Sequence, residues 1–191
     1  MRFLWILLCV FNISFAAPFS LNDLARLKQE NIQGQFTQTK ILKQFEQKII
    51  FSGNFWLLDT ELFWEVKTPL YNLIKISANG IFEKRDDIWV KMDANYDKQL
   101  FLDIIHLNFK SLEQYFTLQL TGNHNAWNLH LTPKNALMRK IFESISIHGG
   151  GGDKIFIKEM ISVEKEGDTT ITQFEILWKK SVFCFLALLQ F

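Results

Sequence analysis

Residues 33–80, QGQFTQTKILKQFEQKIIFSGNFWLLDTELFWEVKTPLYNLIKISANG, decide the fold of this 191-residue chain. Large apolar side chains recur through this stretch, and short polar segments interrupt them at intervals that suit strands joined by tight turns. The pattern predicts consecutive antiparallel strands over residues 33–42, 47–58, 61–68 and 71–78. The third of these has the clearest alternation, which points Leu62, Trp64 and Val66 inward.

The second predicted strand carries large apolar side chains on both faces. These are Phe51, Phe55 and Leu57 on one face, and Ile50, Trp56 and Leu58 on the other. A sheet with one wet face alternates apolar and polar residues instead. Strands of this kind are buried on both sides, or they line a cavity whose contents are themselves apolar.

Strand signals continue beyond residue 80, with short helical segments between them. Asn79 and Gly80 indicate a two-residue hairpin turn, and residues 85–87 indicate the next turn. Further strands are predicted over residues 88–92, 115–121, 126–132, 141–147, 154–164 and 169–178. Helices are predicted over residues 20–31, 99–109 and 134–140, and the glycines at 149–152 are predicted to form a flexible loop.

These elements predict an α+β fold. With about ten strands, an antiparallel sheet tends to curl rather than remain flat. We therefore expect a half-open antiparallel β-barrel covered by helices.

The helix predicted over residues 99–109 is apolar on nearly every side. A helix of this kind is buried or covers an apolar cavity, so we interpret it as a lid. The lid residues are Leu100, Phe101, Ile104, Ile105 and Leu107. Polar groups on a buried helix need partners, so Asp103 and His106 either hydrogen-bond to backbone or mark a helix that moves between wet and dry settings.

The two ends of the chain differ from the segment between them. Residues 1–17 have one basic residue, an apolar run and small residues near the end, which predicts a cleaved signal peptide and a periplasmic location. Residues 18–180 form a single predicted domain. Residues 181–191, SVFCFLALLQF, are too short to span a bilayer. They pack as a final strand, cover a cavity mouth or form an abnormal terminus.

Composition excludes some classes of function. The formal net charge is +1, so nothing directs the protein toward nucleic acid. The two cysteines include one inside the predicted signal peptide, which leaves Cys184 without an intramolecular disulfide partner. Stability is therefore expected to come from the core of a monomer.

Residues able to carry chemistry are few. His106, His124, His130 and His148 do not occur at metal-ligand spacing, so neither a metal site nor a cofactor is expected. Glu61 and Glu65 share one face of a strand but lie about 13 Å apart at about 3.3 Å per residue, which indicates a solvated face. We predict no catalytic residue.

The aromatic surplus favours an apolar cavity over a core alone. The predicted lining residues are Phe36, Phe51, Phe55, Leu57, Leu62, Trp64, Ile74, Ile76 and Val90. A slip of one residue in register would exchange the faces of a strand.

Several short motifs, in this order, resemble the LolA-like periplasmic carriers of outer-membrane lipoproteins. They are F-x-Q (Phe36, Gln38), G-x-x-x-L (Gly53 to Leu57), L-F-W (Leu62 to Trp64), Pro69, Asn79-Gly80, W-x-L-x-L-x-P (Trp127 to Pro133) and G-D-x-T (Gly167 to Thr170). The resemblance runs from about Leu21 to Phe174. It implies a half-open barrel whose apolar cavity holds acyl chains, without cofactor or catalytic group. It also implies an inner-membrane donor complex and an outer-membrane acceptor.

The chain departs from that family in one loop. The best-known carriers have a basic residue and a proline there, and the arginine helps to hold the lid shut. Here the loop is Asp59-Thr60-Glu61, and a carboxylate cannot donate the same hydrogen bonds. Closure by that route, and exchange with the standard lipoprotein partners, are therefore in doubt.

The leading hypothesis is a non-catalytic periplasmic carrier of acylated or lipidic cargo. An exported lipid-processing enzyme or accessory, with Asp103 and His106 acting on an acyl ester, is the first alternative. A structural module of the envelope whose aromatic residues are only core is the second. Lipid that co-purifies with the protein would separate a carrier from both.

Overall fold

The computed structural model describes residues 19–27, 31–92, 98–151 and 156–177, apart from the side chains of residues 98, 99 and 101. The predicted signal peptide, the tail at 181–191 and the side chain of Phe101 lie outside the described residues. Within the described part, no helix is long and apolar enough to cross a membrane.

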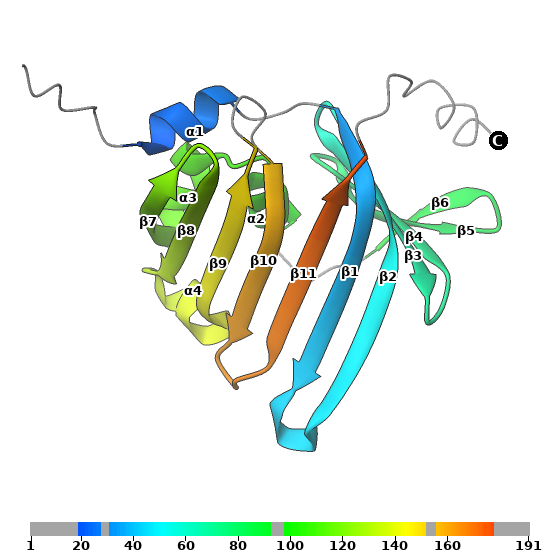
Figure 1. Cartoon of the computed structure of the whole chain (residues 1–191). Helices are drawn as coiled ribbons and strands as arrows, with labels where there is room; N and C mark the ends of the chain where they lie inside the picture. The colour runs from blue at the N-terminus through cyan, green and yellow to red at the C-terminus, as the bar shows by residue number, and fades with distance from the viewer. Residues whose placement is uncertain (1–18, 28–30, 93–97, 152–155, 178–191) are drawn as a thin grey trace, which may run out of the picture.

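One antiparallel sheet of 11 strands organises the described chain, in the order β6-β5-β4-β3-β2-β1-β11-β10-β9-β8-β7 (Figure 1). The strands are β1 (Ile32–Leu42), β2 (Gln47–Leu58), β3 (Glu61–Thr68), β4 (Asn72–Ser77), β5 (Gly80–Arg85), β6 (Ile88–Lys91), β7 (Phe116–Asn123), β8 (Ala126–Pro133), β9 (Phe142–Gly150), β10 (Phe156–Glu164) and β11 (Thr169–Ile176). The pairing of β1 with β11 joins the first strands to the last. The prediction of one large antiparallel sheet is confirmed, with a strand number close to the one expected.

The helices of the described part are few and short. They are α1 (Leu21–Leu27), the 3-10 helix η1 (Lys43–Phe45), α2 (Lys98–Ile105), α3 (Phe109–Tyr115) and α4 (Ala136–Ile141). Figure 1 shows α2 and α3 on one side of the curved sheet. The fold is therefore mostly β, and the α+β class overstated its helical content.

The turns of the β4–β5–β6 meander follow from local backbone chemistry. Asp86 and Asp87 both have positive φ, of 43° and 65°, between the paired residues Arg85 and Ile88. Two positive-φ residues make the tight turn that suits the twist of a hairpin, so this predicted turn is confirmed. The preceding hairpin is also present, but its two turn residues are 78 and 79, and Gly80 already pairs within β5.

The predicted helix over residues 99–109 is wrong in its length. It ends at Ile105, and α3 begins at Phe109 after a corner at Leu107, whose φ is 50°. The buried carboxylate of Asp103 accepts a 2.9 Å hydrogen bond from Asn108 Nδ2 and another from the Ser111 hydroxyl. These bonds stabilise a change of direction that an apolar pattern alone does not reveal.

The predicted glycine loop is wrong at its start, because Gly149 and Gly150 are the last residues of β9. Gly149 pairs with Trp127, and a Cβ at Gly149 would lie 2.0 Å from the indole ring. Only a glycine at position 149 leaves room for the Trp127 ring to lie against the backbone of that residue. The glycine is thus part of the core packing.

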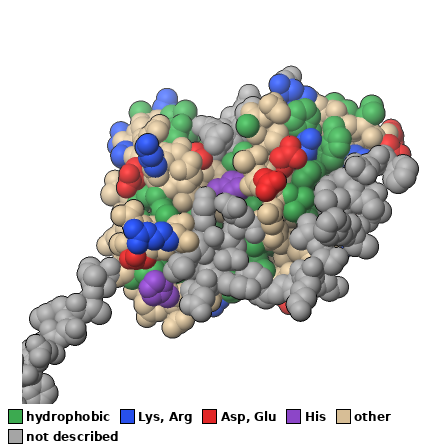
Figure 2. Space-filling model, turned by 90° about the horizontal axis from the view of Figure 1, so that it is seen from above, with side chains coloured by type: hydrophobic (Ala, Val, Ile, Leu, Met, Phe, Trp, Pro, Cys, Tyr) green, Lys and Arg blue, Asp and Glu red, His purple; other side chains and the backbone are tan. Residues whose placement is uncertain are grey.

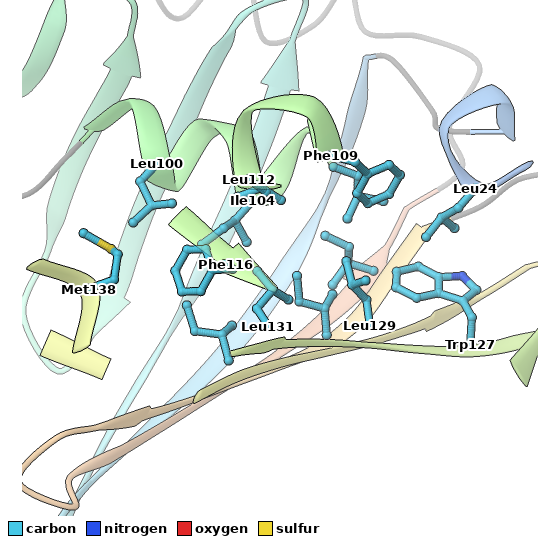
Figure 3. Close-up of a cluster of buried hydrophobic side chains, with 14 residues drawn as sticks. Leu24, Leu100, Ile104, Phe109, Leu112, Phe116, Trp127, Leu129, Leu131 and Met138 are labelled. Carbon is cyan, nitrogen blue, oxygen red and sulfur yellow. The ribbon is translucent and has the colours of Figure 1, made fainter. Parts of the chain in front are cut away.

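One face of the sheet, here called the inner face, carries two apolar clusters. Over β7 to β10, strand side chains such as Leu129 and Ile147 meet side chains from all four α-helices, and this group is here called the packed core (Figure 3). Over β1 to β4 the second cluster contains Phe36, Phe55 and Leu62. Phe174 of β11 contacts both clusters and so marks their boundary.

Candidate functional site

The inner face of the second cluster forms an aromatic floor. Here "the floor" means Phe36, Phe55, Trp64 and Phe174 with the aliphatic side chains around them. The rings of Phe36 and Trp64 stack with centroids 3.8 Å apart, and Phe174 meets Phe55 edge-on at 5.4 Å. Registers of β1 with β2 and β11 place Phe36 opposite Gly53 and Phe174. Strand pairing therefore assembles the rings from distant parts of the chain.

Gly53 makes the stacked arrangement possible. A Cβ at this position would lie 1.7 Å from the carbonyl oxygen of Glu65 and 3.1 Å from the Phe36 ring. The β2–β3 register shifts between Ser52 and Gly53, which indicates a bulge at the same point. Close backbone approach thus lets Phe36 lie flat on the sheet and reach Trp64.

Helix α2 is the only helix that contributes to the cluster around the floor in the described part. Its Leu102 is buried in that cluster and Ile105 packs against it. Leu100 and Ile104 of the same helix point into the packed core instead. α2 therefore bridges the two clusters and covers the floor with a narrow apolar edge.

A cleft lies between the floor and the end of α2. Eleven of its lining residues are apolar or aromatic and His106 is the twelfth: Ile32, Phe55, Leu57, Leu62, Trp64, Ile105, His106, Leu107, Phe156, Ile157, Phe174 and Ile176. The cavity volume is about 30 Å³. That space holds about two water molecules, so α2 nearly fills the cleft.

The floor is less completely buried than the packed core. Trp64 and Phe174 are partly exposed, whereas Phe116 and Leu129 in the packed core are 0% exposed. Viewed from above, hydrophobic side chains are visible at the surface beside acidic groups and a histidine (Figure 2). Two of the four floor rings, those of Trp64 and Phe174, are thus incompletely buried.

The structure places eight of the nine predicted lining residues in one cluster. Phe36, Phe55, Leu57, Leu62 and Ile76 are buried there, while Phe51, Trp64 and Ile74 are partly buried against them. Val90 pairs with Glu83, which pairs with Ile74, so Val90 shares the inner face. It lies on the edge strand β6, outside the cluster.

The predicted lid residues divide between the two clusters. Of the four whose side chains are described, Leu100, Ile104 and Leu107 belong to the packed core, and Ile105 packs against the cluster around the floor. Leu102, which lies inside the predicted lid helix but is not among those five residues, is the buried α2 residue over the floor. The α2 residues that face the floor are therefore Leu102 and Ile105.

Phe174 and Ile176 are the main floor residues that sequence reasoning missed. They alternate with Glu175 at the end of a strand that was predicted, so a signal was present. Assigning them to the floor requires the pairing of Phe174 with Phe36 across more than a hundred residues. One strand's alternation does not supply that pairing.

Asp103 and His106 occupy different settings. The Asp103 side chain, 2% exposed, accepts hydrogen bonds within the α2–α3 corner. His106 lines the cleft and is only partly buried. The contacts of Asp103 give it a structural role at the corner.

The outer face carries charged groups that are paired rather than free. Glu61 lies 3.9 Å from Lys75, and Glu65 accepts a 2.7 Å hydrogen bond from Asn54. Lys75 also lies over the rings of Phe82 and Trp89, at 5.2 and 5.4 Å from their centroids. These contacts stabilise the outer surface of β3 to β6.

Metal-binding geometry is not found in the described part, where no group of three or more His, Cys, Asp or Glu side chains gathers. His130 Nδ1 instead contacts the Ser146 hydroxyl at 3.0 Å, and His124 packs against Phe19. At the β2–β3 turn, the backbone N–H of Asp59 donates a 2.9 Å hydrogen bond to Asn31 Oδ1. This bond ties the turn that lacks a basic residue to the start of β1.

No model of a known protein family matches the sequence, and no curated protein matches it either.

Proposed function

We propose that the chain is a non-catalytic carrier that binds acyl chains of lipoproteins or related lipidic cargo on the floor. The observation that carries the proposal is the cleft between the floor and α2, with apolar walls and partly exposed aromatic rings. Such walls favour an apolar ligand, and the single histidine provides a polar contact for a headgroup. The half-open-barrel architecture and the transfer from an inner-membrane donor to an outer-membrane acceptor are parts of this proposal, through the family resemblance.

Cargo replaces α2 as the cover of the floor. The cavity of about 30 Å³ is far smaller than the roughly 300–1,000 Å³ of typical ligand pockets. Leu102 and Ile105 therefore leave the floor when an acyl chain enters. In this view the structure is the closed, unloaded form.

Exchange of one apolar cover for another makes binding reversible. Each methylene moved from water to an apolar site contributes about 0.8 kcal/mol. Part of that gain is offset because Leu102 and Ile105 lose their own contacts with the floor. A carrier needs this balance, since cargo must be released at the acceptor without chemistry.

Tryptophan quenching tests the site. A fatty acid brominated near its methyl end quenches an indole that it contacts, so we expect part of the protein's emission to fall on titration. Trp64→Phe should remove most of that change, whereas Trp89→Phe, on the outer face, should retain it. Equal quenching in both variants, or none in the parent protein, would contradict binding on the floor.

Extraction of the purified protein with organic solvent, followed by mass spectrometry, identifies the cargo class. Lipid that co-purifies with the parent protein and decreases in Trp64→Phe supports a carrier. Turnover of an acyl ester that is lost in His106→Ala would instead favour the lipid-processing enzyme, because His106 lines the cleft. A rigid protein that binds no acyl probe would favour the structural module.

A further inference from the structure

Exposed hydrophobic side chains gather at one end of the sheet. The antiparallel order brings the connections β1–β2, β3–β4, β8–β9 and β10–β11 to the same end, which is the lower end in Figure 1. Seven of the nine exposed large hydrophobic residues of the described part lie in these four connections: Phe45, Ile49, Ile50, Leu70, Tyr71, Leu137 and Ile141. We call these connections the rim. Of the other two, Ile88 begins the edge strand β6 at the β5–β6 turn, a fifth connection that the antiparallel order places at the same end, and Leu177 follows β11 at the upper end.

These side chains are strongly exposed for their type. Phe45 is 69% exposed, Leu70 is 81% exposed and Leu137 is 60% exposed. Single exposed apolar residues are ordinary on protein surfaces, but a concentration on one edge marks an interaction site. The rim is therefore a candidate docking surface.

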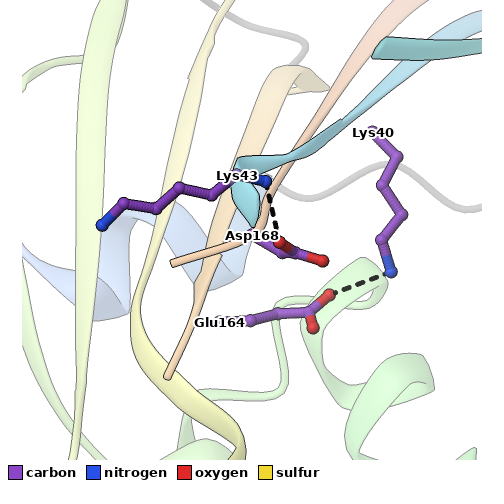
Figure 4. A network of polar contacts seen from close by, with 4 residues as sticks. All are labelled: Lys40, Lys43, Glu164 and Asp168. Carbon is purple, nitrogen blue, oxygen red and sulfur yellow. Dashed lines mark hydrogen bonds and ion pairs between the residues drawn. The ribbon is translucent and has the colours of Figure 1, made fainter. Parts of the chain in front are cut away.

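Hydrogen bonds and an ion pair hold three parts of the rim together. The backbone N–H of Lys43 donates to Asp168 Oδ1 at 3.0 Å, and Lys40 Nζ lies 3.4 Å from Glu164 Oε1 (Figure 4). The N–H of Lys165 donates to the carbonyl of Ile141 at 2.9 Å. The β1–β2 hairpin, the β10–β11 turn and the end of α4 thus form one continuous edge.

The rim is more basic than the chain as a whole. Residues 39–50, 67–72, 134–143 and 163–169 contain eight basic and five acidic residues, a net charge of +3, against +1 for all 191 residues. The remaining residues therefore sum to −2. Positive charge beside exposed apolar side chains is complementary to a surface that has an anionic outer layer and an apolar layer below it.

We propose that the rim docks the protein onto a bilayer surface that carries anionic headgroups. Its apolar side chains stand on separate connections, and lysines lie between them in the sequence, so apolar and basic groups are interspersed along the edge as in segments that lie on a membrane surface. Phe45, Ile50 and Leu70 enter the headgroup layer, while neighbouring lysines extend to the phosphates. This goes beyond the carrier function and does not depend on what the floor binds.

Vesicle flotation tests the proposal with the full chain. Parent protein is mixed with phosphatidylcholine vesicles, with and without phosphatidylglycerol. We expect the protein to float mainly with the anionic vesicles, and less at high salt. The triple variant Phe45→Ser, Ile50→Ser, Leu70→Ser should bind at least tenfold more weakly, whereas Leu177→Ser, at the opposite end of the sheet, should bind like the parent.

All three proteins carry the same terminal segments, so a difference between them reports on the rim. The triple variant should keep the parent's thermal unfolding midpoint, because the altered side chains are exposed, and it should still bind the acyl probe. Equal flotation of the triple variant and the parent would overturn the proposal. Absence of binding of the parent protein to anionic vesicles would also overturn it. Self-association of the parent through the same residues would then show that the rim joins copies of the chain. If the parent protein does not bind the acyl probe, that result counts against the carrier function and not against docking of the rim.

Discussion

The inner face over β7 to β10 and the inner face over β1 to β4 are built from the same alternation of apolar side chains, but they are covered differently. Among the side chains that the structure describes, the packed core has 14 buried members, drawn from strands and all four α-helices. In the same part of the chain, the cluster around the floor has six, of which only Leu102 comes from a helix. Full cover makes a scaffold that excludes a ligand, whereas thin cover leaves apolar rings that a ligand reaches. This difference is the basis on which we propose that one half provides stability and the other binds cargo.

Truncation of one phenylalanine in each half gives the largest expected contrast. Phe116 is 0% exposed in the packed core, so Phe116→Ala should lower the free energy of unfolding by about 3–5 kcal/mol. Phe174→Ala should cost less, because its ring is only partly buried, but it should weaken binding of the acyl probe. Urea denaturation and probe titration of both variants measure the two effects. Equal destabilisation with unchanged probe affinity would remove the distinction between the halves.

The α2–α3 corner links the two halves, and its loss should be the next largest effect. Asp103→Ala removes the buried acceptor of the hydrogen bonds from Asn108 and Ser111 and should destabilise the protein by about 1.5–3 kcal/mol. A loosened α2 should also admit the acyl probe faster, which stopped-flow fluorescence measures. Ser111→Ala, which removes one donor and leaves the acceptor, should do less on both counts. Slower probe entry in Asp103→Ala would contradict a covering role for α2.

The sequence predicts the strands well because alternation is a local property. The predicted strand 47–58 is β2 in full, and 61–68 is β3 in full. The prediction that both faces of β2 are buried is correct near the end of the strand, where Trp56 is 8% exposed. It is wrong near the start of the strand, where Ile50 is 57% exposed. The start of β2 belongs to a hairpin that extends to the rim, and its own residues do not reveal how far neighbouring strands reach.

Features that depend on distant partners could not be predicted in this way. Asp103 was correctly expected to need partners, but the bonds from Asn108 and Ser111 exist only because the chain turns at Leu107. The role of Gly149 depends on the ring of Trp127 on the neighbouring strand. Membership of the floor likewise depends on the pairing of β1 with β11. A local turn decides the first of these features and strand register decides the other two, and alternation within one strand specifies neither.

The outer face of β3 to β6 offers a smaller test of where the binding surface ends. Lys75→Gln removes a cation from the faces of Phe82 and Trp89, and should cost about 0.5–1 kcal/mol. Because Lys75 lies on the face opposite the floor, affinity for the acyl probe should stay at the parent value. Unfolding and probe titrations check both statements. A marked loss of affinity would mean that the binding surface includes the outer face.

The smallest expected effect is a pH response confined to α1, which contributes Leu24 to the packed core and nothing to the cluster around the floor. Hydrogen bonds from the side chain and then the backbone of Ser20 hold the pKa of Asp23 below its ordinary value of 3.8. A carboxylate whose pKa is lowered by folding adds stability above its ordinary pKa, and that stability is lost as pH falls through the lower, folded value.

The protection factors of the α1 amides, which correct exchange rates for the intrinsic effect of pH, should therefore be constant near neutral pH and fall only at pH below about 4. Asp23→Asn removes the titrating group, so protection of α1 should start lower and lose this pH dependence. Probe binding to the floor should remain unchanged in Asp23→Asn at neutral pH, because α1 packs only on the other half. Coupling between α1 and the floor would appear as a change in affinity, and it would show that the packed half regulates the binding half rather than only supporting it.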